Sequence, residues 1–333
     1  MIKITILGAG SVVFTKNVLG DCILTPELGP IHLALHDIDP VRLQDAEKML
    51  ENINKNYGGK AEITSHSDRK EALRGADFVI NTVQIGGYEP CTVTDFEVPK
   101  KYGLRQTIAD TLGIGGIFRA LRTIPFLEEV AEDFHQVCPH AMFLNYTNPM
   151  AMLTGYMQKY LGLNNSIGLC HSVQACVKGL FNSIGMEEYI GNCKWEIAGI
   201  NHQAWLTRIV DGKDNDLYPE IKRRSLSGEY AEKMEWDLVR HDVMHRFGYY
   251  NTESSEHTSE YTPYYIKSKY PQLIERFKIP LDEYPRRCVN QINGWAAQYE
   301  ELANKDIIEH DRSREYASHI MEAIVTGTPY QIG

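Results

Sequence analysis

The chain has 333 residues, of which 43% are hydrophobic, and a formal net charge of −10 at pH 7. This predicts a globular protein of one large or two modest domains, argues against nucleic acid as a partner, and leaves no apolar run long enough for a transmembrane helix. The 7 cysteines form no CxxC pair, which argues against a zinc ribbon or a disulfide framework. The start of the chain lacks the pattern of a signal peptide, so we expect a cytoplasmic protein.

Strands and helices alternate over the first part of the chain. Apolar runs predict strands, and apolar residues at helical spacing predict helices. The expected strands are 2–7, 31–35, 61–64 and 78–83, with expected helices at 14–24 and 40–56. This alternation predicts an α/β fold with a doubly wound, Rossmann-like parallel sheet, of the kind found in lactate and malate dehydrogenases.

The pattern changes further along the chain. Residues 88–116 look irregular, and a long loop inside a domain is usually functional. Next come an expected helix at 117–137, a strand at 141–146, a helix from residue 150, a strand at 166–170 with a helix after it, antiparallel strands at 195–200 and 204–210, and helices at 227–246, 281–304 and 313–326. We therefore expect a dinucleotide-binding domain over 1–190 and a mixed α+β domain for substrate and metal over 191–333.

The first expected strand ends in a glycine turn. Gly8 and Gly10, followed by Ser11, allow the backbone to approach a pyrophosphate at a helix N-terminus. Asp37 closes the second strand, where a carboxylate accepts both ribose hydroxyls and repels a 2′-phosphate, which favours NAD over NADP. We expect Asn81, at the end of the fourth strand, to line the nicotinamide side. The alternative is a plain turn beside an exposed acid, but strand, turn, helix, strand and acid all occur in the right order.

A thiol and an imidazole each follow an apolar run. Cys170 ends one run and His202 follows another, and our hypothesis is that they hold one divalent metal beside the dinucleotide. A Cys–His pair is more often structural than a ligand, because cysteine commonly only packs. Asn148 precedes a proline, which favours an extended backbone and turns its amide toward a substrate hydroxyl, although a simple turn asparagine is an equal alternative.

Several short motifs occur together and in a fixed order. They are Gly8-Ala9-Gly10-Ser11, His36-Asp37-Ile38-Asp39, Ala76-Asp77-Phe78-Val79-Ile80-Asn81-Thr82, Thr147-Asn148-Pro149, Cys170-His171-Ser172-Val173 and Gly199-Ile200-Asn201-His202. With these motifs the chain resembles family 4 of the glycoside hydrolases, which are NAD- and metal-dependent glycosidases. The Cys-His-Ser-Val form resembles the α-galactosidase (melibiase) branch. Family members usually continue beyond residue 333, so we expect a C-terminal part to be missing.

The resemblance implies roles for the residues in these motifs. Cys170 and His202 would be ligands of a divalent ion, usually Mn²⁺, although manganese prefers oxygen to thiolate. His171 would protonate the leaving oxygen. Asn148 and Asn201 would bind the sugar.

The resemblance also implies a catalytic base. Tyr261 is our choice, with Asp110 raising its basicity and Arg286 contacting the substrate. Other members use an acid in the same loop, so the alternatives for the base are Glu253, Glu256 and His257.

The implied reaction is the hydrolysis of an α-galactoside. NAD⁺ takes a hydride from C3 of the sugar, the base removes the C2 proton, the leaving group departs from C1, water adds, and the hydride returns. The alternatives are an α-glucosidase or another sugar specificity in the same family, an NAD-dependent 2-hydroxy acid dehydrogenase, and a non-catalytic NAD-binding regulator. Apolar helical faces late in the chain favour a homodimer or homotetramer.

Overall fold

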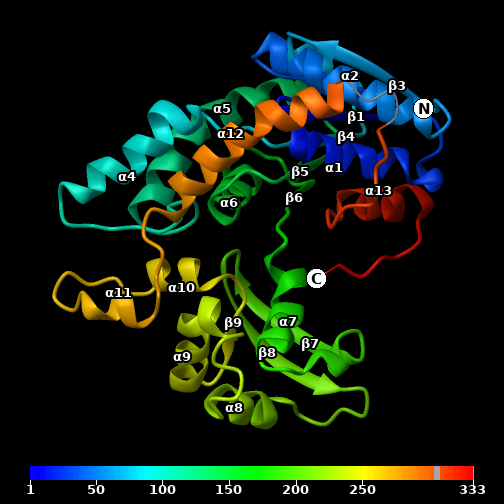
Figure 1. The fold of residues 1–333 in the computed structure, drawn as a ribbon. Coiled ribbons are helices and arrows are strands. Elements are labelled where there is room, and N and C mark those ends of the chain that lie inside the picture. The colour runs from blue at the N-terminus through cyan, green and yellow to red at the C-terminus, as the bar shows by residue number, and fades with distance from the viewer. Residues whose placement is uncertain (304–307, 333) are drawn as a thin grey trace. The chain divides into compact units, whose positions relative to one another are not determined.

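The computed structural model describes residues 1–303 and 308–332, and its contacts divide the chain into two compact units (Figure 1). Unit 1 comprises Met1–Gly87, Arg119–Leu169 and Val289–Ile332, and unit 2 comprises Tyr88–Phe118 and Cys170–Cys288. Of the points where the chain passes from one unit to the other, those after Phe118 and Cys288 lie inside helices, α5 (Gly113–Val137) and α12 (Glu283–Ala303).

A six-stranded sheet forms the centre of unit 1. Its strands are β1 (Ile2–Leu7), β2 (Ile31–His36), β3 (Ala61–His66), β4 (Phe78–Asn81), β5 (Met142–Asn145) and β6 (Ser166–Gly168). All neighbouring strands are parallel, in the order β3-β2-β1-β4-β5-β6. The predicted doubly wound, Rossmann-like sheet is confirmed. The order reverses between β1 and β4, and sheets of this kind bind ligands outside the strand ends at such a point.

Apolar side chains bury both faces of this sheet. One core cluster includes Ile4 and Ile6, and a second includes Leu7, Val79 and Phe143. Successive residues of a strand point to opposite faces, so Ile6 and Leu7 belong to different clusters. The other helices of unit 1 are α1 (Val12–Ile23), α2 (Pro40–Asn56), α3 (Arg69–Leu73), α6 (Met150–Tyr160) and α13 (Ala317–Thr326), with a 3-10 turn at Pro26–Leu28.

The start of α2 shows how the sequence directs the local fold. Asp39 accepts hydrogen bonds from the backbone N–H groups of Val41 (3.0 Å) and Arg42 (3.2 Å), and Pro40 occupies the first turn. Both features favour helix initiation, because they satisfy or remove donors that have no partner inside the helix. The helix that we predicted at 40–56 is confirmed.

Unit 2 contains a small antiparallel sheet with helices packed on it. The strands are β7 (Cys193–Ile200), β8 (Gln203–Asp211) and β9 (Tyr250–Asn251). The helices are α4 (Val93–Lys100), α7 (Ser172–Ser183), α8 (Tyr218–Leu226), α9 (Leu238–Phe247), α10 (Ser255–Tyr261) and α11 (Gln272–Arg276), with shorter turns at Gly87–Thr92, Glu187–Tyr189 and Glu235–Asp237. Asn201 and His202 form the turn between β7 and β8. The predicted α+β character of this region is confirmed.

Some predicted elements were wrong in extent. The region 88–116, predicted as irregular, contains α4, which lacks a separate apolar face and has Pro99 within it. The predicted helix 227–246 is confined to α9, and α8 before it was not predicted. The predicted helix 281–304 corresponds to α12, and its last residue lies outside the described residues.

The contact boundary after Leu169 precedes the domain boundary that we placed at residue 190. The reason is that α7 packs Cys176, Leu180 and Phe181 into one core with Leu206 and Ile209 of β8. The functional division into a dinucleotide-binding and a substrate-binding part stays a prediction.

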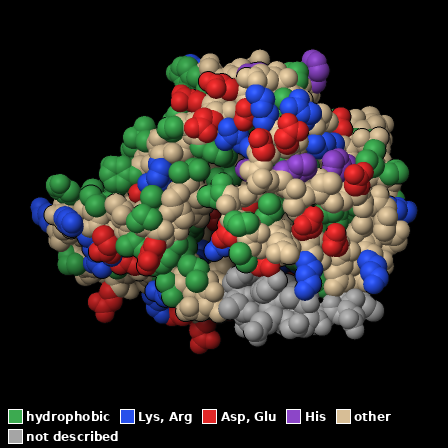
Figure 2. All heavy atoms as spheres, turned by 90° about the horizontal axis from the view of Figure 1, so that it is seen from above, with side chains coloured by type: hydrophobic (Ala, Val, Ile, Leu, Met, Phe, Trp, Pro, Cys, Tyr) green, Lys and Arg blue, Asp and Glu red, His purple; other side chains and the backbone are tan. Residues whose placement is uncertain are grey.

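Figure 2 shows that acidic and basic side chains are intermingled on the drawn face rather than separated by sign. Among the residues that the structure describes, no helix combines the length and apolarity needed to cross a membrane.

Candidate active site

A thiol and an imidazole meet in unit 2. Cys170 lies between β6 and α7, and His202 lies in the β7–β8 turn with a φ of 61°. The two residues approach with Cys170 Sγ 3.2 Å from His202 Nε2. A positive φ is uncommon for a residue with a side chain and is often found at functional sites. The structure therefore brings together the two residues that we proposed as metal ligands.

A carboxylate completes this group. Glu253 Oε2 lies 3.7 Å from His202 Nε2, and the candidate ligand atoms of Cys170, His202 and Glu253 all lie within 4.8 Å of one another. Sulfur, nitrogen and oxygen donors in one cluster suit a divalent transition metal. The residues present therefore fit a metal ion.

The Cys170–His202 pair favours a thiolate beside an imidazolium. Burial is the largest influence and raises the pKa of Cys170, but the hydrogen bond and charge of His202, with a hydrogen bond from Ser172, together bring the pKa below the ordinary value of 9.0. Burial lowers the pKa of His202, yet its interactions with Asp110 and Cys170 raise it to about 11. The thiolate is the form of cysteine that binds metals.

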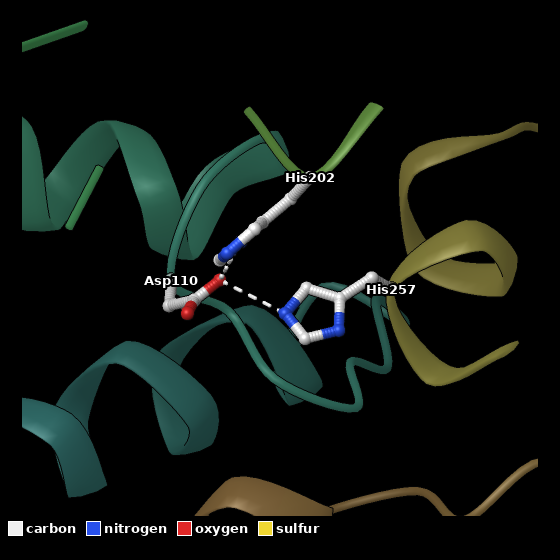
Figure 3. A group of neighbouring side chains, drawn as sticks. All are labelled: Asp110, His202 and His257. Carbon is white, nitrogen blue, oxygen red and sulfur yellow. Dashed lines mark ion pairs between the residues drawn. The ribbon is translucent and has the colours of Figure 1, made fainter. Parts of the chain in front are cut away.

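A second cluster forms around Asp110, which precedes α5 (Figure 3). Its Oδ1 atom lies 3.5 Å from His202 Nδ1 and 3.6 Å from His257 Nε2. Figure 3 shows the carboxylate pointing toward both rings, one from the β7–β8 turn and the other from α10. Although burial opposes ionisation, hydrogen bonds and charge from the two histidines hold the pKa of Asp110 well below its ordinary value. These three residues form a second group with metal-ligand spacing.

Tyr261, at the end of α10, is bonded to the same carboxylate. Its hydroxyl donates to Asp110 Oδ1 at 2.7 Å and accepts from the backbone N–H of Thr111 at 3.1 Å. Burial, followed by the negative charge of Asp110, raises the pKa of Tyr261 well above 10.0. The phenol is therefore protonated at neutral pH, and its oxygen becomes strongly basic once the proton is removed.

The alternative bases have different surroundings. Glu253 faces the His202 ring, whereas Glu256 Oε1 accepts a hydrogen bond from Arg287 Nη2 at 3.1 Å. His257 Nδ1 lies 2.8 Å from Ser254 Oγ. Glu256 is thus already engaged in an ion pair, whereas Glu253 lies in the cluster with Cys170 and His257 lies in the cluster with Asp110.

Glu260 organises the loop that carries Asp110, and the sequence analysis missed it. Its Oε2 atom accepts the backbone N–H groups of Thr107 (2.6 Å) and Ile108 (2.7 Å), and Oε1 accepts that of Ala109 (3.0 Å). Burial raises the pKa of Glu260 despite these bonds. No local pattern identifies this role, because its partners are about 150 residues away in the chain.

The three proposed sugar-binding residues lie in different surroundings. Asn201 has buried amide nitrogen and oxygen atoms that find no hydrogen-bond partner among the described residues. Arg286 is paired with Glu283 in the first turn of α12, and its side chain is 56% exposed. Asn148, in unit 1, accepts a hydrogen bond from the Met150 N–H at 3.2 Å. Of these three residues, Asn201 has two buried amide atoms that make no hydrogen bond within the described part of the chain.

His171 is the N-cap residue of helix α7. It is partly buried and directly follows Cys170. Its predicted role as a proton donor to the leaving group stays a prediction.

The glycine turn in unit 1 has the expected local geometry. Gly8 has a φ of 90°, and a Cβ at Gly10 would lie 2.7 Å from Asp37 Oδ2. The Gly10 N–H donates to that oxygen at 2.7 Å, while Ser11 is exposed at the start of α1. Asn81 is fully buried and donates to Asn145 Oδ1 at 2.9 Å, so the bonds seen for it are structural. Contacts of these residues with NAD stay predictions.

Comparison with known families decides the identity of the chain. The model of the family 4 glycosyl hydrolases matches residues 3–186, and the model of their C-terminal domain matches residues 197–333. The chain belongs to family 4 of the glycosyl hydrolases. The resemblance that we inferred from the motifs is confirmed, and this family 4 chain is a glycoside hydrolase rather than a hydroxy-acid dehydrogenase.

Relatives of this family 4 enzyme include two α-galactosidases. That of Bacillus subtilis (strain 168) is 55% identical over 334 residues, which cover 100% of this chain and 76% of the relative. That of Rhizobium meliloti (strain 1021) is 34% identical over 339 residues, which cover 99% of this chain and 68% of the relative.

A solved structure shows the same fold. The crystal structure of a putative glucosidase from Bacillus subtilis superposes with a TM-score of 0.80 at 25% identity, covering 97% of this chain and 76% of that one. A 6-phospho-α-glucosidase from gut microorganisms, solved with NAD and Mn²⁺, has a TM-score of 0.75 at 22% identity and covers 97% of this chain and 74% of its own.

Proposed function

We propose that this family 4 enzyme is an α-galactosidase that depends on NAD and a divalent metal. The observation that carries the proposal is the 55% identity with an α-galactosidase along the whole chain. The close approach of Cys170 and His202 supports the metal dependence. A protein of the same fold was solved with both NAD and Mn²⁺. Dependence on NAD also agrees with the cytoplasmic location expected from the sequence.

Cys170 and His202 would hold the metal, with Glu253 as a further oxygen ligand. The cluster supplies a sulfur, an imidazole nitrogen and a carboxylate, and the lowered pKa of the thiol favours the ligand form. A bound divalent metal would act as a Lewis acid on a sugar oxygen. The Glu253 carboxylate would supply an oxygen ligand, which Mn²⁺ prefers to thiolate. A Cys–His pair without an oxygen ligand would be an unusual site for Mn²⁺.

In unit 1 the glycine turn and Asp37 would bind NAD. Gly8 and Gly10 bring the main chain close to the diphosphate, beside Ser11, and Asp37 would accept the ribose hydroxyls. We retain Asn81 on the nicotinamide side as a prediction. When bound, NAD accepts and returns a hydride. The proposed domains remain 1–190 for the dinucleotide and 191–333 for substrate, with Asp110 and Cys170 contributed from the first.

Tyr261 would act as the base, with Asp110 as its partner. The phenol donates a 2.7 Å hydrogen bond to Asp110 Oδ1, and the negative charge of Asp110 would raise the basicity of Tyr261 Oη, which would take the proton from C2 once the phenol has lost its own proton to solvent. Glu253 is the rival base, since its side chain faces the same histidine, with Oε2 at 3.7 Å from His202 Nε2. His171 would donate a proton to the leaving oxygen.

Asn201 would bind sugar hydroxyls through its amide. Its nitrogen and oxygen are buried and lack hydrogen bonds within the described part of the chain, and a buried polar group without a partner costs about 1–3 kcal/mol. A sugar hydroxyl would satisfy both atoms. Asn148 and Arg286 stay predicted substrate contacts, and a homodimer or homotetramer stays the predicted assembly.

One assay tests this function. Hydrolysis of p-nitrophenyl α-galactoside is measured with NAD⁺, Mn²⁺ and a reductant, and each is then omitted in turn. We expect activity only with all three present and no net accumulation of NADH. Accumulation of NADH with a 2-hydroxy acid would instead identify a dehydrogenase, and faster cleavage of the α-glucoside would change the sugar specificity. Binding of NAD without any hydrolysis would favour the regulator.

A further inference from the structure

The hydroxyl of Thr111 lies between two groups of the candidate metal site. Its Oγ1 atom is 2.8 Å from Asp110 Oδ1 and 2.6 Å from His202 Nδ1. Thr111 has no exposed surface, and Asp110 and His202 are only 7% and 5% exposed. Both distances are those of good hydrogen bonds, and at this depth each polar group needs a partner within the protein.

The direction of both hydrogen bonds follows from the number of protons. A threonine hydroxyl has one hydrogen, and an ionised carboxylate can only accept. Asp110 Oδ1 also accepts the Tyr261 hydroxyl at 2.7 Å, so it is the acceptor toward both neighbouring hydroxyls. Thr111 must therefore donate to Asp110, and its oxygen can only accept from His202. The His202 nitrogen that faces it, Nδ1, must carry a hydrogen.

This arrangement determines which nitrogen of His202 can bind a metal. A neutral imidazole that is protonated on Nδ1 has its lone pair on Nε2. Nε2 is the atom that lies 3.2 Å from Cys170 Sγ and 3.7 Å from Glu253 Oε2. Histidines that bind metals commonly donate their other N–H to a neighbouring acceptor, which fixes the tautomer and the ring orientation.

We infer that Thr111 is a positioning residue that holds His202 in the tautomer able to bind a divalent metal. The inference rests on the proposed metal site. Thr111 also donates its backbone N–H to Tyr261 Oη at 3.1 Å, and a side-chain substitution leaves that donor in place. Replacement of the hydroxyl therefore removes the contacts with His202 and Asp110 and keeps the backbone donor to Tyr261.

The test compares Mn²⁺ binding by the full chain and three variants. Thr111→Val replaces the hydroxyl with a methyl group of similar size, and Thr111→Ser keeps the hydroxyl. Thr5→Val is the matched control, because Thr5 is also fully buried and its hydroxyl donates to the Ala72 carbonyl at 2.8 Å in unit 1. MnCl₂ is titrated into each protein, and free Mn²⁺ is followed by electron paramagnetic resonance.

We expect Thr111→Val to weaken Mn²⁺ binding about 10–100-fold, which is typical of a lost partner to a metal-binding histidine. Thr111→Ser should bind nearly as well as the parent, and Thr5→Val should bind like the parent. Thr111→Val loses two buried hydrogen bonds and Thr5→Val loses one, so both should melt below the parent. Because Mn²⁺ binding is measured on protein that is folded at the assay temperature, a loss of affinity in Thr111→Val that Thr5→Val does not show reports on the site and not on general stability.

Two results would overturn the inference. They are Mn²⁺ affinity in Thr111→Val equal to that of the parent, and an equal loss in Thr111→Ser and Thr111→Val. A Cys170→Ser protein separates this failure from that of the proposed function. If the parent and Cys170→Ser bind Mn²⁺ equally, the metal site itself is wrong. If Cys170→Ser loses binding while Thr111→Val does not, the site stands and the role of Thr111 falls.

Discussion

In unit 1 the candidate cofactor site is made mainly of backbone, whereas the candidate metal site in unit 2 is made of side chains from separate segments. Gly8 and Gly10 lie in one turn, and Asp37 holds the Gly10 N–H from the neighbouring strand. Thr111 and His202 share a hydrogen bond in unit 2 although they lie 91 positions apart in the chain. Binding through backbone groups should survive substitution of nearby side chains that do not enter the site. A site built from side chains should lose binding when any one of them is replaced.

This difference predicts that single substitutions in unit 2 will have larger effects than those in unit 1. The members of the unit 2 cluster share partners, since Asp110 Oδ1 alone is bonded to Tyr261 and Thr111 and faces two histidines. Groups in one hydrogen-bond network are energetically coupled.

Cys170→Ser should have the largest effect, because it removes the sulfur ligand of the candidate metal site in unit 2. Loss of the thiolate should lower kcat about 1000-fold or more, because a Lewis acid supplies several kcal/mol to such reactions. NAD affinity, followed by fluorescence titration, should not change. Cys193→Ser is the control, since Cys193 is a partly buried free thiol in β7. Full activity of Cys170→Ser with unchanged Mn²⁺ dependence would contradict its role as a ligand.

Tyr261→Phe removes the hydroxyl that bonds to Asp110 and keeps the ring. If Tyr261 is the base, kcat should fall about 10²–10⁴-fold with little change in KM. Tyr264→Phe, at a tyrosine that is 50% exposed, is the control and should be as active as the parent. Glu253→Gln decides between the rival bases. Near-normal kcat in Tyr261→Phe together with a large loss in Glu253→Gln would assign the role to Glu253.

Asp110→Asn should destabilise the protein by about 2 kcal/mol, because hydrogen bonds to charged groups are worth about 1.5–3 kcal/mol each. The folded-state pKa of Asp110 lies well below the ordinary 3.8. Its stabilisation is therefore fully present above the pKa of the unfolded chain and is lost as pH falls through the folded value. Urea unfolding should show the same difference from the parent at pH 5 and pH 7, and a smaller one in strong acid.

Glu260→Gln provides the contrast for Asp110→Asn. Burial raises the pKa of Glu260, so its charged form is disfavoured in the folded protein. The amide oxygen of glutamine can still accept backbone N–H groups. We expect a smaller loss of stability than in Asp110→Asn at pH 7. A larger loss would show that the loop depends more on the Glu260 charge than on the Asp110 charge.

Asp37→Ala, in the candidate cofactor site of unit 1, should have the smallest effect on activity. Loss of the carboxylate should weaken NAD binding roughly 10-fold, the cost of about one hydrogen bond to a charged group, and should narrow the preference for NAD over NADP. Asp39→Ala is the matched control, because Asp39 caps α2 and should affect stability alone. Equal NAD affinity in the two variants would remove Asp37 from the cofactor site.

Much of the fold could be predicted because its determinants are local. The apolar strands, Pro40 at the start of α2 and the glycine turn are all recognisable within a few residues. The sequence also indicated Cys170 and His202 as candidates, since each follows an apolar run. It did not reveal α4, whose residues have no separate apolar face, nor the contact boundary after Leu169.

The amino-acid sequence by itself determined the parallel sheet, the glycine turn with its acid, and membership of the glycosidase family. Only the tertiary structure decided that Cys170 Sγ meets His202 Nε2, that Thr111 faces the other nitrogen, and that Glu260 gathers the backbone before Asp110. The physical reason is range. Helix and strand formation depends on neighbours in the chain, whereas a hydrogen bond between distant residues exists only after the backbone has folded and buried both partners.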